Sequence, residues 1–136
     1  MILLDTHIWI WWVHRDLTHW DVIGALEDRD GDDLAVSAIS CWEVAKLVEL
    51  GRLDLKSAVE EWLFDALTPS GIRLLPLTPQ IAAEACSLPG DFHRDPADQI
   101  IVATSRVHDI PILTADQKIL SYPYVSLFDG DTIHDG

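Results

Sequence analysis

The stretch His93-Arg94-Asp95-Pro96-Ala97-Asp98-Gln99-Ile100-Ile101-Val102-Ala103-Thr104-Ser105 joins an acidic entrance to a nearly unbroken apolar run. Asp95 suits a helix N-cap and Pro96 suits the first helical position, so this pattern predicts a helix that runs to about His108. Asp98 then lies in the first turn, at the mouth of a helix with a buried body. Capping alone would explain both carboxylates, because acidic side chains are favoured at helix N-termini. A functional role requires other carboxylates aimed at the same place.

The composition predicts one globular domain. The chain has 136 residues, of which 49% are hydrophobic and 24% charged, enough for one hydrophobic core. We therefore expect a single domain over 1–136, with the acidic tail 129–136 frayed. No apolar run approaches the roughly 20 residues that span a bilayer, and the N-terminus has no feature of a signal peptide, so we expect a cytoplasmic protein that does not enter membranes.

Cysteine and histidine spacing indicates neither a disulfide framework nor a zinc site. Cys41 and Cys86 lie far apart and outside any C-x-x-C motif, so we expect them to be reduced core residues. The histidines are scattered, and no pair has the spacing of a zinc motif.

The most informative bulk property is the net charge of −14. A protein that binds nucleic acid by neutralising phosphates usually has a basic surface, so the sequence excludes that class unless another component supplies positive charge. A divalent metal ion or a basic partner would have to offset the repulsion. If the protein does not act on nucleic acid, its acidity needs no explanation beyond solubility.

Short apolar runs alternate with amphipathic segments along the chain. The runs resemble strands buried on both faces of a parallel sheet, and they lie at 1–4, 34–37, 72–75 and 111–114, with a further edge strand expected at 125–128. Helices are expected at 7–13, 18–29, 44–50, 54–68, 78–88 and 96–108, and after residue 116 as far as 120. This alternation predicts an α/β fold with a parallel central sheet of four to five strands and helices on both faces. In such sheets, ligands bind beyond the carboxyl ends of the strands.

Four acidic residues fall at that edge of the predicted sheet. Asp5 ends the first strand, Glu43 follows the second, Asp116 follows the fourth, and Asp98 begins the helix that leads to the fourth. Glu43 has an alternative role, because it stands three residues after Ser40 in the spacing of a capping box. Neighbouring carboxylates raise one another's pKa and oppose folding, so a cation is expected between them.

A divalent ion is the best candidate for that cation. Lys46 and Arg94 lie near Glu43 and Asp98 in the sequence, but each could pair with only one carboxylate. An all-oxygen ligand set selects Mg²⁺ or Mn²⁺. Such an ion acidifies a bound water and neutralises the charge that develops on a phosphate, which is the chemistry of phosphodiester hydrolysis. No glycine-rich phosphate loop, Ser-His-Asp arrangement or nucleophilic cysteine motif indicates another reaction.

The motifs carry a family resemblance that covers nearly the whole chain. They are Asp5-Thr6-His7-Ile8-Trp9, Ser37-Ala38-Ile39-Ser40-Cys41-Trp42-Glu43, His93 to Thr104, and Leu113-Thr114-Ala115-Asp116. In this order the sequence resembles the PIN-domain family and, more narrowly, the VapC toxins of bacterial toxin–antitoxin pairs. The resemblance implies a Mg²⁺- or Mn²⁺-dependent endoribonuclease that leaves a 3′-hydroxyl and a 5′-phosphate. It also implies a homodimer and inhibition by a small cognate antitoxin whose tail covers the active site.

The resemblance assigns roles to residues of this chain. The family's acidic quartet, the expected catalytic metal ligands, falls on Asp5, Glu43, Asp98 and Asp116. Asp95 either ligates metal or only caps its helix, and Thr6 and Thr114 match small hydroxyl positions that help to orient metal or water.

The expected contacts to RNA are less defined. Gln99 stands where many relatives have arginine, which removes a positive charge near the site. The basic residues nearest the mouth of the site are Lys46, Arg52 and Arg94, and we expect them to contact RNA.

Two other classes of function fit parts of the sequence. A Mg²⁺-dependent phosphotransfer domain of receiver or phosphatase type also places carboxylates at parallel strand ends. That class usually has a lysine at a late strand end, whereas Lys118 is expected on a helix. A non-catalytic interaction module would use its tryptophans to bind a partner and its carboxylates only as caps. Core packing is the simpler explanation of the crowded Trp9, Trp11 and Trp12.

Overall fold

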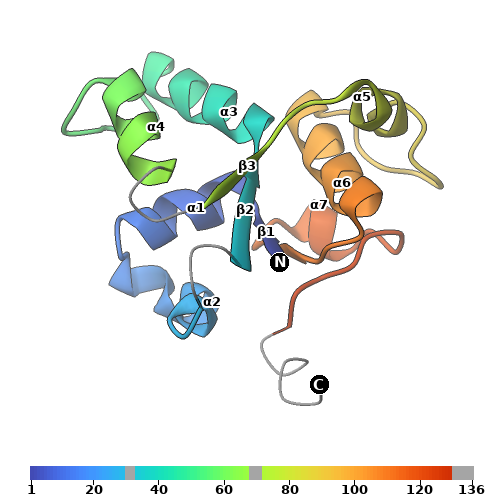
Figure 1. Ribbon diagram of the computed structural model, residues 1–136, viewed down its shortest axis with the longest axis horizontal. Coiled ribbons are helices and arrows are strands. Elements are labelled where there is room, and N and C mark those ends of the chain that lie inside the picture. The colour runs from blue at the N-terminus through green and yellow to red at the C-terminus, as the bar shows by residue number, and fades with distance from the viewer. Residues whose placement is uncertain (30–32, 68–71, 130–136) are drawn as a thin grey trace.

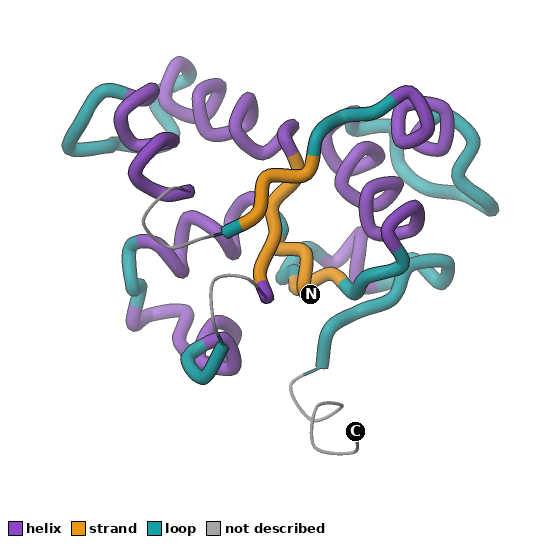
Figure 2. The backbone as a smooth tube through the Cα atoms, in the orientation of Figure 1, coloured by secondary structure: helices purple, strands orange, loops and turns teal. Residues whose placement is uncertain are grey.

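A computed structural model describes residues 1–29, 33–67 and 72–129 of the chain. Its elements alternate between strands and helices, as Figures 1 and 2 show. In chain order they are β1 (Ile2–Leu4), α1 (Thr6–Val13), the 3₁₀ turn η1 (Leu17–His19), α2 (Trp20–Ile23), the 3₁₀ turn η2 (Gly24–Leu26), β2 (Leu34–Ser37), α3 (Ala38–Glu49), α4 (Val59–Leu67), β3 (Arg73–Leu75), α5 (Pro79–Ala85), α6 (Pro96–His108), β4 (Ile112–Leu113) and α7 (Gln117–Leu120).

The strands form one parallel sheet in the order β3-β2-β1-β4. The α/β prediction with a parallel sheet is therefore confirmed, and in the described residues the sheet has four strands. The edge strand expected at 125–128 is reduced to one parallel bridge between Ile112 and Leu127. Because β4 is only two residues long, it offers little backbone for a further strand to pair with.

Both faces of the sheet are covered. Ile2 and Leu4 of β1 belong to one apolar cluster, with residues of α1, α3 and α4, whereas Leu3 between them belongs to a second cluster with residues of α6 and α7. This division follows from the alternation of side chains along a strand. Figure 1 shows the corresponding layers, with α1 to α4 on one side of the sheet and α5 to α7 on the other. The prediction of strands buried on both faces is confirmed for β1 and β2, whereas it is wrong for β3, whose Arg73 and Leu74 are exposed because β3 lies at the edge of the sheet.

Among the helices that differ from the sequence expectation are those predicted over 54–68 and 18–29. The helix expected over 54–68 begins only at Val59, and its expected last residue lies outside the described part. Leu53 and Leu55 both pack on the first cluster, which is the two-residue period of extended chain. The helix expected over 18–29 is divided into η1, α2 and η2. The tail from residue 130, which was expected to be frayed, also lies outside the described residues.

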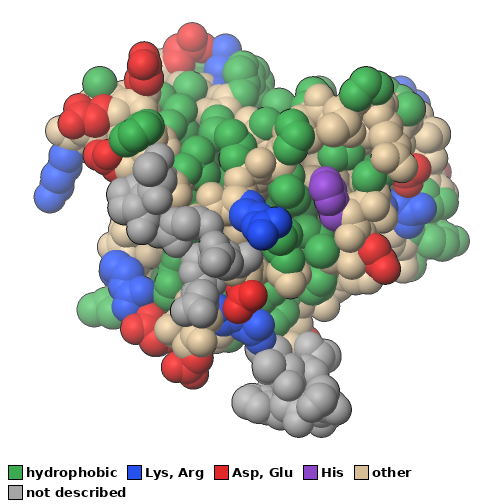
Figure 3. Space-filling view, in the orientation of Figure 1, with side chains coloured by type: hydrophobic (Ala, Val, Ile, Leu, Met, Phe, Trp, Pro, Cys, Tyr) green, Lys and Arg blue, Asp and Glu red, His purple; other side chains and the backbone are tan. Residues whose placement is uncertain are grey.

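The outer surface carries apolar side chains over the sheet edge. Leu74 of β3 is 46% exposed and Leu77, which follows β3, is 47% exposed. In the view of Figure 3, apolar side chains extend across the middle of the face, while acidic ones gather at the corner formed by α3 and α4. Within the described residues, no helix has the length and apolar character needed to cross a bilayer.

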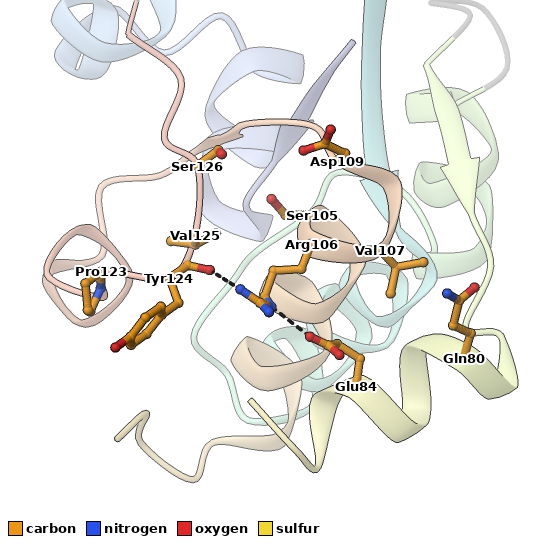
Figure 4. A pocket seen from close by; sticks show the side chains of 10 residues that line it. All are labelled: Gln80, Glu84, Ser105, Arg106, Val107, Asp109, Pro123, Tyr124, Val125 and Ser126. Carbon is orange, nitrogen blue, oxygen red and sulfur yellow. Dashed lines mark hydrogen bonds and ion pairs between the residues drawn. The ribbon is translucent and has the colours of Figure 1, made fainter. Parts of the chain in front are cut away.

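Arg106 of α6 links α5 to the C-terminal segment that contains Tyr124. Its Nε donates to Glu84 Oε2 of α5 (2.7 Å), and its Nη1 donates to the backbone oxygen of Tyr124 (2.6 Å), beside the pocket drawn in Figure 4. None of the predicted site residues lines that pocket. These contacts therefore indicate a structural role.

Replacing Arg106 by alanine should lower the free energy of unfolding by about 1 to 2 kcal/mol, because two charge-assisted hydrogen bonds are lost together. Urea denaturation followed by circular dichroism measures the change. The control is Lys56→Ala, at an exposed lysine with no ion pair in the described part of the chain, which should change stability by less than about 0.5 kcal/mol. Equal effects of the two substitutions would contradict the assigned role.

Candidate metal centre

The carboxylates predicted from the sequence line one pocket at the carboxyl edge of the sheet. The pocket brings together side chains that follow β1 and β4, lie on α3, or begin α6; its lining is Asp5, His7, Trp11, Glu43, Asp95, Asp98, Ala115 and Asp116. The predicted acidic quartet thus meets in space, and Asp95 joins it. His7 and Trp11 were not among the predicted site residues.

Asp5 is fixed by hydrogen bonds from two directions. Its Oδ1 accepts from the backbone N–H of Thr6 (2.8 Å) as the N-cap of α1, and its Oδ2 accepts from Thr114 Oγ1 (2.7 Å). Thr114 Oγ1 in turn accepts from the backbone N–H of Asp116 (3.0 Å). One hydroxyl therefore connects the segments that follow β1 and β4. Thr114 thus contacts one member of the acidic quartet, whereas its expected role in orienting metal or water stays a prediction.

Glu43 does not form the capping box that its spacing suggested. Helix α3 begins at Ala38, and its N-cap is Ser37, whose Oγ accepts from the backbone N–H of Ile39 (3.2 Å). Ser37 caps the helix directly at the end of β2, so the helix starts earlier than expected and Ser40 lies inside it. Glu43 is consequently one turn into α3.

The side chain of Glu43 accepts a short hydrogen bond from Thr6 Oγ1. That hydroxyl also hydrogen bonds with Ser40 Oγ, 2.8 Å away. Thr6 therefore holds Glu43 at the pocket, and Ser40 supports Thr6 from beneath.

Asp95 and Asp98 stand at the start of α6, as the opening stretch predicted. Asp95 is the N-cap, and its Oδ1 accepts from the backbone N–H of Asp98 (3.0 Å). Asp98 Oδ2 lies 3.0 Å from His93 Nε2, although that buried nitrogen makes no hydrogen bond of good geometry in the structure. His93 was not predicted to be a site residue. Its place at the head of the acidic motif was the available signal.

The pocket carries an excess of negatively charged groups. Burial, followed by the repulsion of Asp5, Asp95 and the other acidic neighbours, raises the pKa of Asp98 to about 7. Burial is also the main cause that raises the pKa of Asp5 and of Glu43 above their ordinary values. No lysine or arginine is among the described residues that line the pocket. The site therefore lacks the positive charge that its carboxylates require.

The donor chemistry fits a hard divalent cation, because carboxylate oxygens are the ligands that Mg²⁺ and Mn²⁺ prefer. Among the described residues, no group of three or more His, Cys, Asp or Glu side chains is arranged to hold a metal ion as the side chains stand. Mg²⁺ keeps several waters when it binds, so it does not require such a closed shell. Carboxylates can also approach an ion by rotation about their side-chain torsions.

The predicted basic residues are divided between two surfaces. Lys46 and Arg52 line a mostly apolar groove that shares Glu43 and Asp95 with the acidic pocket. Arg94 lines a different pocket, together with Gln99.

The side chain of Gln99 makes a structural contact. Its Nε2 donates to the backbone oxygen of His93 (3.1 Å) and so holds the loop that precedes α6. The sequence could not reveal this contact, because it depends on how that loop folds back.

The sequence model of the PIN domain matches residues 2–123, which is most of the chain. The chain belongs to the PIN domain family. Ribonuclease VapC22 of Mycobacterium tuberculosis is 35% identical over 121 residues, which cover 89% of this chain and 91% of that protein. The resemblance stated from the motifs is thereby confirmed.

Solved structures of other proteins share the fold. FitAcB from Neisseria gonorrhoeae has a TM-score of 0.67 and 27% identity, over 96% of this chain and 98% of that chain. VapC20 of Mycobacterium tuberculosis, described as a sarcin-ricin loop cleaving toxin, has a TM-score of 0.69 and 15% identity, over 95% of this chain and all of that one.

Proposed function

We propose that this PIN domain is a metal-dependent endoribonuclease and the toxin of a VapBC-type toxin–antitoxin pair. The observation that carries the proposal is the pocket in which five carboxylates meet without a lysine or arginine among its described lining residues. The similarity to Ribonuclease VapC22 supports RNA as the substrate. The phosphotransfer and interaction-module alternatives have no comparable support.

In this proposal Asp5, Glu43, Asp98 and Asp116 hold Mg²⁺ or Mn²⁺, and Asp95 either joins them or only caps α6. The bound ion would supply an acidified water and neutralise charge on the scissile phosphate. The chain's own groups position the ligands. Thr6 and Thr114 fix the orientation of Glu43 and Asp5 through their hydroxyls.

His93 lies against Asp98 and limits where that carboxylate can turn.

Attack of water on phosphorus with departure of the 3′-oxygen would leave a 3′-hydroxyl and a 5′-phosphate. These end groups are the expected products of the proposed reaction.

The proposal includes partners. Lys46 and Arg52 are the better-placed contacts for RNA phosphates, because their groove shares Glu43 and Asp95 with the acidic pocket, whereas Arg94 lines a separate pocket. A small cognate antitoxin would cover the site; one protein that shares the fold is part of a toxin–antitoxin complex from Klebsiella pneumoniae. A homodimer is also proposed, and the exposed Leu74 and Leu77 are apolar surface of the kind that partners bury. Both RNA and antitoxin would be met in the cytoplasm.

The experiment that tests the function is cleavage of end-labelled RNA by the purified chain with Mg²⁺, with Mn²⁺ and with EDTA. We expect cleavage only with metal, restoration when excess Mg²⁺ follows EDTA, and products that a 5′-phosphate-dependent exonuclease degrades. The matched control is Asp65→Asn, which removes a carboxylate on α4 that does not line the pocket and should cleave as wild type does. Equal cleavage in EDTA would refute metal dependence, and labelling of an aspartate by acetyl phosphate would favour the phosphotransfer alternative.

A further inference from the structure

The acidic pocket has an aromatic wall that the metal chemistry does not use. Trp11 and His7, both on α1, line the pocket together with the carboxylates. Their rings are 6.3 Å apart at an angle of 55°, so they border the same space without stacking on each other. Trp9 on the same helix is fully buried in the core, whereas Trp11 is partly exposed. Trp11 also packs against the core cluster that contains Trp9, but part of its side chain stays exposed and lines the pocket, where a ligand can reach it.

The indole of Trp11 is held in place by a stacked histidine. The ring of His19 stacks on it with centroids 3.6 Å apart and an interplanar angle of 3°. His19 is fixed by Asp16, whose Oδ2 lies 3.1 Å from its Nδ1. The backbone N–H of Asp16 donates to the backbone oxygen of Trp11 (3.0 Å), in a reversal where Arg15 has a left-handed φ of 52°. The imidazole of His19 covers one face of the Trp11 indole and fixes the orientation of the ring.

The charge of the pocket makes a neutral binding surface important. RNA is a polyanion, and the pocket offers it five carboxylates and, among its described lining residues, no lysine or arginine. A metal ion would attract a phosphate but would not distinguish a nucleotide from another phosphate ester. Stacking on an aromatic ring binds a base without a charge, and it requires that the base be unpaired.

We propose that Trp11 is a stacking platform for an unpaired base of the RNA next to the scissile phosphate, with His7 at its border. This inference rests on the proposed function, because it assigns a substrate contact to the same site. It restricts the substrate to RNA whose cleaved segment is single-stranded, such as a loop or an unpaired end. Trp11 is thus a specificity residue, whereas the carboxylates serve the chemistry.

The test compares two small ligands that differ only in the base. Adenosine 5′-monophosphate and ribose 5-phosphate are each titrated into the wild-type chain with Mg²⁺, and indole N–H resonances are followed by nitrogen–proton correlation spectra. The resonance that disappears in Trp11→Phe identifies Trp11. We expect it to shift with adenosine 5′-monophosphate and not with ribose 5-phosphate. A shift of another indole, or of none, would overturn the inference.

The affinities of tryptophan variants for the two ligands provide a second test. Trp11→Ala should weaken binding of adenosine 5′-monophosphate about tenfold or more and leave ribose 5-phosphate unchanged. The matched control is Trp12→Ala on the same helix, because Trp12 packs near Arg15 and Trp20 and does not line the pocket. Equal loss in both variants, or none in Trp11→Ala, would contradict the assignment. If Trp11→Ala fails to fold, the wild-type spectra still decide.

The two proposals can fail separately. A chain that cleaves RNA with metal but binds both ligands equally retains the proposed function and loses the stacking platform. A chain that binds the nucleotide through Trp11 but cleaves no RNA retains the platform and loses the nuclease.

Discussion

Asp98→Asn should lower metal-dependent RNA cleavage by roughly a thousandfold or more while the chain stays folded. Asparagine keeps the shape of the side chain but removes the charge that we propose to bind the metal. Loss of a residue that only supports a ligand typically lowers affinity or activity about 10- to 100-fold, so a direct ligand should exceed that range. Initial rates on end-labelled RNA at saturating Mg²⁺ measure the effect, and calorimetric titration with Mg²⁺ should show weakened binding.

Asp65→Asn is again the matched control, because it makes the same chemical change outside the pocket. Circular dichroism should give the same spectrum for both variants and the wild type. If Asp98→Asn cleaves as fast as the wild type, the Asp98 carboxylate only supports the start of α6. That result would contradict its proposed role as a metal ligand and favour the interaction-module alternative.

The metal-free chain should become less stable as pH rises from about 4 to about 7, by about 1 kcal/mol per pH unit from Asp98 alone. The pKa of this carboxyl is raised from 3.8 to about 7 in the folded chain, so the folded state binds the proton that the unfolded state has already released. The stabilisation is complete below the unfolded pKa and is lost as pH approaches the folded one. Urea denaturation in EDTA at several pH values measures this slope.

Asp98→Asn should flatten the slope and make the metal-free chain more stable than the wild type at pH 8, since no buried charge remains at that position. Asp5 and Glu43, whose pKa values burial also raises, should leave a smaller slope of the same sign. Mg²⁺ should raise wild-type stability at pH 8 by mass action and do so much less in the variant. Identical slopes in the two proteins would show that Asp98 is not the titrating group.

The sequence was most informative where a strand end and a helix start carry strong local signals. The Asp95-Pro96 pair predicted the start of α6, and the apolar runs predicted β1 and β2. Parallel topology then placed Asp5, Glu43, Asp98 and Asp116 at one edge of the sheet, and they do line one pocket. Their proposed metal-binding role remains a prediction.

Local sequence signals gave a wrong helix start where two serines could each cap the same helix. Ser37 and Ser40 both precede helical sequence, and only the position of the end of β2 decides that Ser37 caps α3. The contact of His93 with Asp98 and the stack of His19 on Trp11 depend on loops that fold back, and periodicity does not describe loops. The start of α4 was misplaced for a similar reason, because Leu53 and Leu55 are apolar in extended chain as well as in a helix.

The hydrogen bond from Thr114 to Asp5 joins residues separated by 109 positions along the chain. A polypeptide emerging from the ribosome cannot close this contact until β4 has been synthesised and has docked beside β1. Every earlier nascent chain therefore lacks one wall of the pocket. The proposed nuclease would therefore become active only after Thr114 has been synthesised and the sheet has closed around it.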